Sequence, residues 1–147
     1  MSTYYSARRS LMSMSQRQTL EQRYATKVYA KANAYSGESK DIRTRYGNLA
    51  FTLPIMIRSA GLVQALHFAS TRKKAEQKQF LEDLADVLGY QNTQELLDQS
   101  RTAQITEYMR LTRQTLAVLV WFKRFAQSIL DLEASEATES DSGENNA

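Results

Sequence analysis

The sequence predicts an all-α protein: a compact, single-domain bundle of about five to six helices. Apolar residues recur every three or four positions through most of the chain, and no stretch keeps the alternation of a β-strand. Glycine and proline are rare, with five and one in 147 residues, which suits a helical bundle. Hydrophobic residues make up 42% of the chain, enough for one core of ordinary size.

Both ends of the chain are predicted to lie outside the bundle. Residues 1–15 contain Arg8, Arg9, five serines and no acid, and are predicted to form a flexible basic arm. Residues 131–147 carry six acids and no base, with too few apolar residues to offset the entropy cost of ordering. They are predicted to be a disordered acidic tail, which leaves 16–130 as the bundle domain. The tail either competes with nucleic acid for the basic body or is a solvated segment without that role.

The first two helices are predicted from apolar spacing and from the residues that stop them. The first runs from Gln16 to about Tyr35, and Gly37 follows as its C-terminal stop. Ser39 is the predicted N-cap of the second helix. Pro54 cannot donate a backbone hydrogen bond, so it is predicted to end or kink that helix, with a short continuation to Ala60.

The remaining helices are predicted in the same way. A third helix runs from Leu62 to the basic triplet at 72–74, and a fourth, amphipathic helix ends at Gly89. Asn92 and Glu95 have the spacing of a capping box that opens a short helix. The final helix begins near Gln104 and carries two apolar rows, so it is predicted to be buried on most sides. A third row on it presents Arg110, Gln114, Trp121 and Arg124.

The net charge of +3 is unevenly distributed along the chain. Residues 1–74 hold 13 basic and 3 acidic residues, whereas residues 131–147 hold only acids. Without the tail the body carries a charge of +9. A basic excess of that size favours a polyanionic partner such as nucleic acid.

Several classes of chemistry are disfavoured by composition. The absence of cysteine excludes disulfides, thiolate metal sites and cysteine nucleophiles, and is compatible with a cytoplasmic location. His67 has no base or ligand nearby in sequence, and Glu82, Asp83 and Asp86 are predicted on the solvent side of their helix. No glycine-rich phosphate loop occurs. We therefore predict no enzyme, no metal site and no cofactor.

The longest apolar run, 116–122, is too short to cross a bilayer, which needs about 20 residues, so no membrane partner is predicted.

Two stretches resemble a known family. They are LPIMIRSAGLVQALHF at 53–68 and EYMRLTRQTLAVLVWFKRFAQSIL at 107–130. Both resemble the small α-helical subunit of Cmr complexes, the type III-B CRISPR effectors in which a guide RNA selects target RNA. Together with the basic first helix, the likeness covers about residues 16–130 and leaves out the arm and the tail.

The resemblance implies a non-catalytic subunit of an antiviral defence complex. Several copies would stack head to tail beside the guide-binding backbone subunits and touch the target strand of the guide–target RNA duplex. The implied partners are the backbone and large subunits, copies of the chain itself and that duplex. Lys and Arg contacts to phosphates give affinity without sequence preference, which suits a protein whose specificity comes from base pairing with the guide.

Two sets of candidate residues follow, and for each residue the alternative is a solvated helix face or packing within the domain. The first set is basic and is predicted to contact RNA: Arg23, Lys27, Lys31, Arg43, Arg45, Arg58, Arg72, Lys73 and Lys74. The second set lies on the final helix and is predicted to contact a neighbouring subunit, because Trp and Arg are favoured interface anchors: Arg110, Arg113, Trp121, Lys123 and Arg124.

Two other functions compete with this interpretation. The first is a helix-turn-helix DNA-binding protein with its turn at Gly61, although a recognition helix needs polar residues where this chain has Leu62 and Leu66. The second is a structural adaptor that binds only protein, through the Trp121 face. Salt dependence separates them, because phosphate binding weakens steeply with salt and an apolar interface does not.

Overall fold

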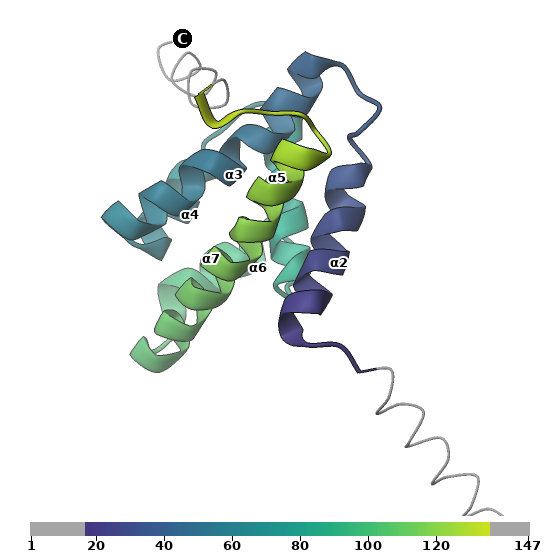
Figure 1. Ribbon diagram of the computed structural model, residues 1–147. Helices are drawn as coiled ribbons and strands as arrows, with labels where there is room; N and C mark the ends of the chain where they lie inside the picture. The colour runs from purple at the N-terminus through teal and green to yellow at the C-terminus, as the bar shows by residue number, and fades with distance from the viewer. Residues whose placement is uncertain (1–16, 136–147) are drawn as a thin grey trace, which may run out of the picture.

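Six helices form the part of the chain that the computed structural model describes, residues 17–135 (Figure 1). This described part contains no β-strand, which confirms the predicted all-α fold. Residues 1–15 of the predicted arm and residues 136–147 of the predicted tail lie outside it, so their predicted flexibility stays a prediction. The helices are α2 (Leu20–Asn33), α3 (Lys40–Ala60), α4 (Leu62–Ala69), α5 (Ala75–Val87), α6 (Thr93–Thr102) and α7 (Ile105–Ser128).

Helix α7 is the central contact of the bundle. It packs against α2 on one side and against α3 on the other (Figure 1). Helix α5 packs against α3, and α6 packs against both α4 and α5. The first and last helices of the described chain therefore lie side by side, and α7 separates α2 from most of α3.

Helix α2 begins at Leu20, four residues later than the sequence pattern predicts. The reason is a reciprocal capping box that the pattern analysis missed. The Thr19 Oγ1 accepts a hydrogen bond from the Gln22 backbone N–H at 3.1 Å, and the Gln22 side-chain oxygen accepts from the Thr19 N–H at 2.8 Å. Ser39 caps α3 as predicted, accepting from the Ile42 N–H at 3.4 Å.

Of the two effects predicted for Pro54, ending the helix does not occur: the predicted continuation to Ala60 is part of α3 itself. The helix runs on to Ala60, and Gly61 ends it with a φ of 91° while its N–H donates to the Ile57 oxygen at 2.9 Å. A proline inside a helix costs about 3 kcal/mol. Burial of the neighbouring Leu53 and Ile57 in the core offsets that cost.

Helix α4 is shorter than predicted, ending at Ala69 and not at the basic triplet. The hydroxyls of Ser70 and Thr71 each donate to a carbonyl of the last turn, those of His67 and Phe68, both at 2.7 Å. Such side-chain bonds compete with continuation of the helix. Lys74 is then the N-cap residue of α5.

The boundary between α5 and α6 follows the prediction. Gly89 has a φ of 95°, a conformation that favours glycine, and ends the α5 turn. The Asn92 side chain accepts from the Glu95 N–H at 2.8 Å, as predicted. The Glu95 carboxylate accepts from the N–H of Gln91 at 2.9 Å, one residue before the position that a standard capping box uses.

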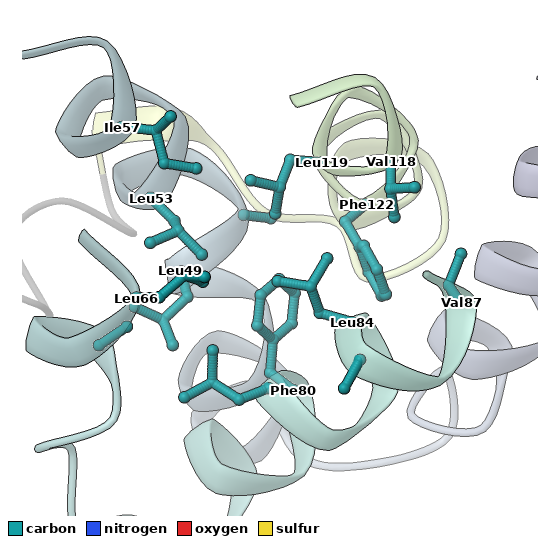
Figure 2. Packing of buried hydrophobic residues seen from close by; sticks show 14 of the residues in the cluster. Leu49, Leu53, Ile57, Leu66, Phe80, Leu84, Val87, Val118, Leu119 and Phe122 are labelled. Carbon is teal, nitrogen blue, oxygen red and sulfur yellow. The ribbon is translucent and has the colours of Figure 1, made fainter. Parts of the chain in front are cut away.

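The core lies where α3, α5 and α7 meet (Figure 2). Rings of Tyr46, Phe80 and Phe122 form a continuous row across it, through an edge-to-face contact and then a tilted contact, with centroids 5.5 Å and 4.8 Å apart in turn. The first turns of α7 extend beyond this core. Ile105 and Met109 begin one of the two apolar rows from which the sequence predicts burial of this helix on most sides. Ile105 is 71% exposed and Met109 is also exposed, so that prediction is wrong at this end of the helix.

The packed chain extends past the predicted boundary at residue 130. Asp131 adopts a left-handed φ of 55°, and the turn it makes returns Leu132 to the core, where it is 2% exposed. Leu132 lies over Gly47 of α3, so close that a Cβ on Gly47 would come within 2.5 Å of the Leu132 Cδ1. We call this contact the Gly47 notch.

Candidate nucleic-acid interface

Basic and acidic residues are divided between different helices. Helices α2, α3 and α7 together hold 11 bases and 3 acids, whereas α5 and α6 hold 2 bases and 6 acids. Because α7 packs against both α2 and α3, the three basic helices are neighbours. Which of their cations are available to a ligand depends on the contacts that each one makes within the chain.

Lys31 and Arg45 are paired with carboxylates of α5. The Lys31 Nζ lies 2.8 Å from an oxygen of Asp86 and 3.9 Å from one of Asp83. The hydrogen bond to Asp86 is the main cause of a raised Lys31 pKa. The Arg45 Nε lies 3.3 Å from the Glu76 carboxylate. These charges are already balanced inside the protein.

Arg43 and Arg72 make structural contacts. The Arg43 guanidinium donates to the carbonyl of Leu130 at 2.5 Å and to that of Glu38 at 3.1 Å, so it ties the end of α7 to the start of α3. The Arg72 side chain lies over the Phe68 ring, 5.1 Å from its centroid, and the residue is only 7% exposed. Little of Arg72 can reach a ligand, although the sequence pattern places it in the basic triplet.

Asp83 is buried, so its predicted place on the solvent side of α5 is wrong. It is 6% exposed and accepts from the Tyr46 hydroxyl at 2.6 Å and from the Gln79 amide at 2.8 Å. Burial first, and then the Asp83 charge, raise the pKa of Tyr46. Tyr35 stacks on Tyr46 with a centroid distance of 4.0 Å. The carboxylate therefore anchors α5 to α2 and α3.

Four other predicted cations are exposed. Arg23 and Lys27 lie one turn apart on α2, and Lys73 and Lys74 lie in the connection from α4 to α5. Within residues 17–135 none of these four side chains has an ion pair. They are free to meet phosphate.

A groove between α3 and α7 brings together three more exposed cations: Arg58, Lys123 and Arg124. It has a volume of about 330 Å³. The sequence pattern assigns Arg58 to RNA and the other two to a subunit interface, but the fold puts all three beside the same surface. We call it the α3–α7 groove; its lining residues are Phe51, Pro54, Ile55, Arg58, Leu119, Val120, Lys123, Arg124 and Gln127.

Two exposed apolar side chains lie beside the cations of this groove. Ile55 on α3 is 64% exposed, and Val120, also exposed, lines the groove from α7. On each helix the apolar residue precedes a cation by about one turn, as Ile55 precedes Arg58 and Val120 precedes Arg124. That shared spacing was a sequence signal for the groove, but nothing local indicates that the two helices are adjacent.

Trp121 does not lie on an exposed face of α7. It is half-buried, its ring lies 5.7 Å from that of Phe125, and it lines a shallow pocket with Leu20 and Tyr24 of α2. The exposed stripe of α7 keeps Arg110 and Arg124 of the predicted row but has Arg113 and Val120 in place of Gln114 and Trp121. It consists of Arg110, Arg113, Ala117, Val120 and Arg124, with Arg110 3.7 Å from Glu107.

Arg101 was missed by the sequence analysis and explains the environment of His67. The His67 Nδ1 lies 2.8 Å from the Val63 carbonyl, which can only accept, so Nδ1 carries the proton. The Nε2 then accepts from Arg101 at 2.9 Å. Arg101 also pairs with Asp98, whose pKa is lowered by the hydrogen bond from Gln94 and by Arg101. Both ring nitrogens of His67 are therefore engaged: Nδ1 bonds within α4, and Nε2 joins α4 to α6.

The geometry disfavours the helix-turn-helix interpretation. Helix α4 has eight residues, buries Leu62, Ala65 and Leu66, and contains no Lys or Arg. It packs against α3 and α6 and does not project from the bundle. A recognition helix needs exposed polar residues at its start.

Residues 17–135 contain neither a candidate metal site nor a membrane-spanning helix. No group of three or more His, Cys, Asp and Glu residues in this range could hold a metal ion. No helix in the same range is long and apolar enough to cross a membrane.

Comparison with known proteins gives consistent results. Residues 20–129 match the model of a family described as CRISPR-associated protein (Cas_Cmr5). The chain is 44% identical over 114 residues to the CRISPR system Cmr subunit Cmr5 of Thermus thermophilus, covering 77% of this chain and 97% of that protein. A crystal structure of a CRISPR-associated Cmr5 family protein from the same organism matches with a TM-score of 0.72 and 42% identity, covering 77% of this chain and 98% of that one.

Proposed function

The chain belongs to the Cmr5 family of CRISPR-associated proteins, and we propose that it serves as the non-catalytic small subunit of a type III-B RNA-targeting effector complex. Several copies stack beside the guide-binding backbone, and their basic faces contact the target RNA strand. The role is antiviral defence in the cytoplasm, and the partners are the other Cmr subunits, further copies of the chain and the guide–target duplex.

The observation that carries the RNA contact is the set of exposed cations on neighbouring helices. Arg23 and Lys27 on α2, Arg58 on α3, and Lys123 and Arg124 on α7 are exposed. Unlike Lys31 and Arg45, they form no ion pair with residues 17–135. Exposed Lys and Arg bind phosphates without reading bases, as a subunit must when the guide supplies specificity.

Two separate apolar patches support stacking. One is formed by Ile105 and Met109 in the first turns of α7, and the other by Leu20 and Val120, both exposed near the start of α2. Ile105 and Val120 are about 22 Å apart along the helix axis. A head-to-tail contact joins two different surfaces of identical subunits, so it requires two such patches.

The non-catalytic role is supported by the contacts that Asp83 and His67 make within the fold. Asp83 accepts hydrogen bonds from Tyr46 and Gln79, and His67 is held between Val63 and Arg101. General acid–base catalysis needs groups that can exchange protons with a substrate. These groups instead join helices to one another.

The test is target-RNA binding by a reconstituted complex that contains guide RNA and altered small subunits. Arg23→Gln with Lys27→Gln removes two exposed cations and should weaken target binding. The slope of log affinity against log salt should fall by about 0.7 per lost phosphate contact on a single strand. Lys31→Gln with Arg45→Gln is the matched control, because it removes the same charge from paired positions.

The outcomes separate the candidate functions. Weaker binding only in the Arg23 and Lys27 variant supports direct phosphate contact by exposed cations. Equal losses in both variants would mean that total charge matters and not the exposed face. Normal assembly with no effect in either variant would favour the structural adaptor, which contacts protein alone.

A further inference from the structure

The acidic C-terminal segment departs from a fixed point beside the α3–α7 groove. The Leu132 side chain fills the Gly47 notch, and its N–H donates to the Ala126 carbonyl at 3.0 Å. Arg43 holds the Leu130 carbonyl just before it. The chain that follows Leu132 is thus anchored to both α3 and α7, the two helices that form the groove.

The groove lies within easy reach of that anchor. Phe51, at its near end, is four residues after Gly47 on α3, or about 6 Å along the axis, and Arg58 is about 16 Å along it. On α7, Gln127 of the groove follows Ala126 directly. The twelve residues 136–147 can span up to roughly 40 Å when extended, so length does not limit contact.

The charges of the groove and the segment are complementary. The groove is lined by Arg58, Lys123 and Arg124 and by no acidic residue. None of these three cations has an ion-pair partner in the described part of the chain. Residues 136–147 contain no base and four acids: Glu136, Glu139, Asp141 and Glu144.

Tethering makes even a weak contact significant. A short flexible linker gives an effective local concentration in the millimolar range, far above that of a free peptide in a cell. The segment also lies outside residues 20–129, which match the family model, so the shared family properties assign it no role.

We propose that residues 136–147 bind within the same chain to the α3–α7 groove and compete there with RNA phosphates for Arg58, Lys123 and Arg124. The competition with RNA rests on the proposed function, whereas the docking of the segment does not. The segment acts as a built-in polyanion that weak or nonspecific RNA cannot displace. A target strand held by guide pairing displaces it.

Docking can be measured without RNA. The chain has no cysteine, so Ser140→Cys gives one site for a paramagnetic spin label on the full-length protein. We expect broadening of the backbone amide signals of Arg58, Val120 and Arg124, while those of α6 stay sharp. The broadening should disappear at 1 M salt, where the screening length is about 3 Å.

Two charge variants show whether the groove is specific. Arg58→Gln with Lys123→Gln and Arg124→Gln should abolish the broadening. Arg23→Gln with Lys27→Gln and Lys73→Gln removes the same charge from exposed sites elsewhere and should leave it intact. Absent or uniform broadening, or equal loss in both variants, would overturn docking in the groove.

Competition is then tested with single-stranded RNA. Glu136→Gln, Glu139→Gln, Asp141→Asn and Glu144→Gln together should raise RNA affinity by about threefold or more, since a millimolar tethered competitor is removed. The gain should vanish when Arg58, Lys123 and Arg124 are also neutralised.

Broadening with unchanged RNA affinity would overturn the proposed competition between the segment and RNA. A gain in affinity without broadening would mean general repulsion and overturn docking. Broadening in a chain that binds no RNA would support docking while the proposed RNA contact fails.

Discussion

At the level of single side chains, Tyr46 is a phenol that its surroundings keep neutral. It is almost fully buried and donates to Asp83 at 2.6 Å. Burial, and then the neighbouring carboxylate, raise its pKa above the ordinary value of about 10. The folded-state pKa is thus above that of the unfolded chain. The resulting stability is fully present below pH 10 and is lost as pH rises above it.

We predict a steep alkaline loss of stability that depends on this residue. Above pH 10 the free energy of unfolding should fall with pH more steeply in the natural protein than in Tyr46→Phe, by about 1.4 kcal/mol per pH unit. Urea unfolding followed by circular dichroism between pH 8 and pH 11 measures both slopes. Lys31 and Tyr35, whose pKa values are also raised, contribute in the same direction in both proteins.

The same variant should be less stable at neutral pH, because Asp83 loses a buried donor, at a cost of about 1–3 kcal/mol. The informative quantity is therefore the difference between the two slopes of unfolding free energy against pH, and not the difference in stability at neutral pH. Parallel slopes for the two proteins would show that Tyr46 ionises in the folded state without penalty.

Side chains also show where sequence reasoning stops. The pattern on α2 places Arg23, Lys27 and Lys31 along one border, and they look equivalent in sequence. Only Lys31 is paired, because the fold brings Asp86 beside it from a helix more than fifty residues further on. Arg45 is paired with Glu76 for the same reason. Exposure of a cation depends on tertiary neighbours, which no local pattern contains.

At the level of helices, the sequence predicts a helix boundary correctly where residues close to that boundary determine it. Gly89 and Asn92 mark the boundary of α5 and α6 as predicted. Pro54 did not end α3, because tertiary burial of its neighbours outweighs the lost backbone bond. The boundary near Leu130 was placed too early, since Leu132 finds its partner on a helix 85 positions earlier in the sequence.

The Gly47 notch yields a prediction about coupling between two helices. Leu132→Ala should cost about 2–5 kcal/mol, the range for a buried leucine. Gly47→Ala gains about 1 kcal/mol of helix propensity, but its Cβ displaces the Leu132 side chain. Gly47→Ala should therefore be more favourable in the Leu132→Ala background than in the natural protein.

A double-mutant cycle in urea measures this coupling. A chain truncated after Ser135 serves as the control, and its stability should stay within about 0.5 kcal/mol of the full chain, because Gly47 and Leu132 are both kept. Additive effects of the two substitutions would show that the leucine and the glycine do not meet.

At the level of the assembled protein, the two apolar patches predict a separation between folding and stacking. Ile105→Ser with Met109→Ser should reduce the number of small subunits in the reconstituted complex, as counted by native mass spectrometry. The melting temperature of the isolated subunit should change little, because both side chains are exposed. Ile55→Ser is the matched control, since Ile55 is similarly exposed and belongs neither to the patch of Ile105 and Met109 nor to the pocket lined by Leu20 and Val120. A full complement of subunits in the double variant would exclude this patch from the stacking contact.

The pairing of α2 with α7 has a consequence for the time at which the protein can fold. The 71 residues between these helices take roughly 4–14 s to synthesise on a ribosome. During that interval the apolar side of α2, with Tyr24, Val28 and Ala32, lacks its main partner helix. The Gly47 notch is filled later still, once Leu132 has emerged. We therefore expect nascent chains that stop before α7 to bind chaperones, and only chains that include Leu132 to resist protease.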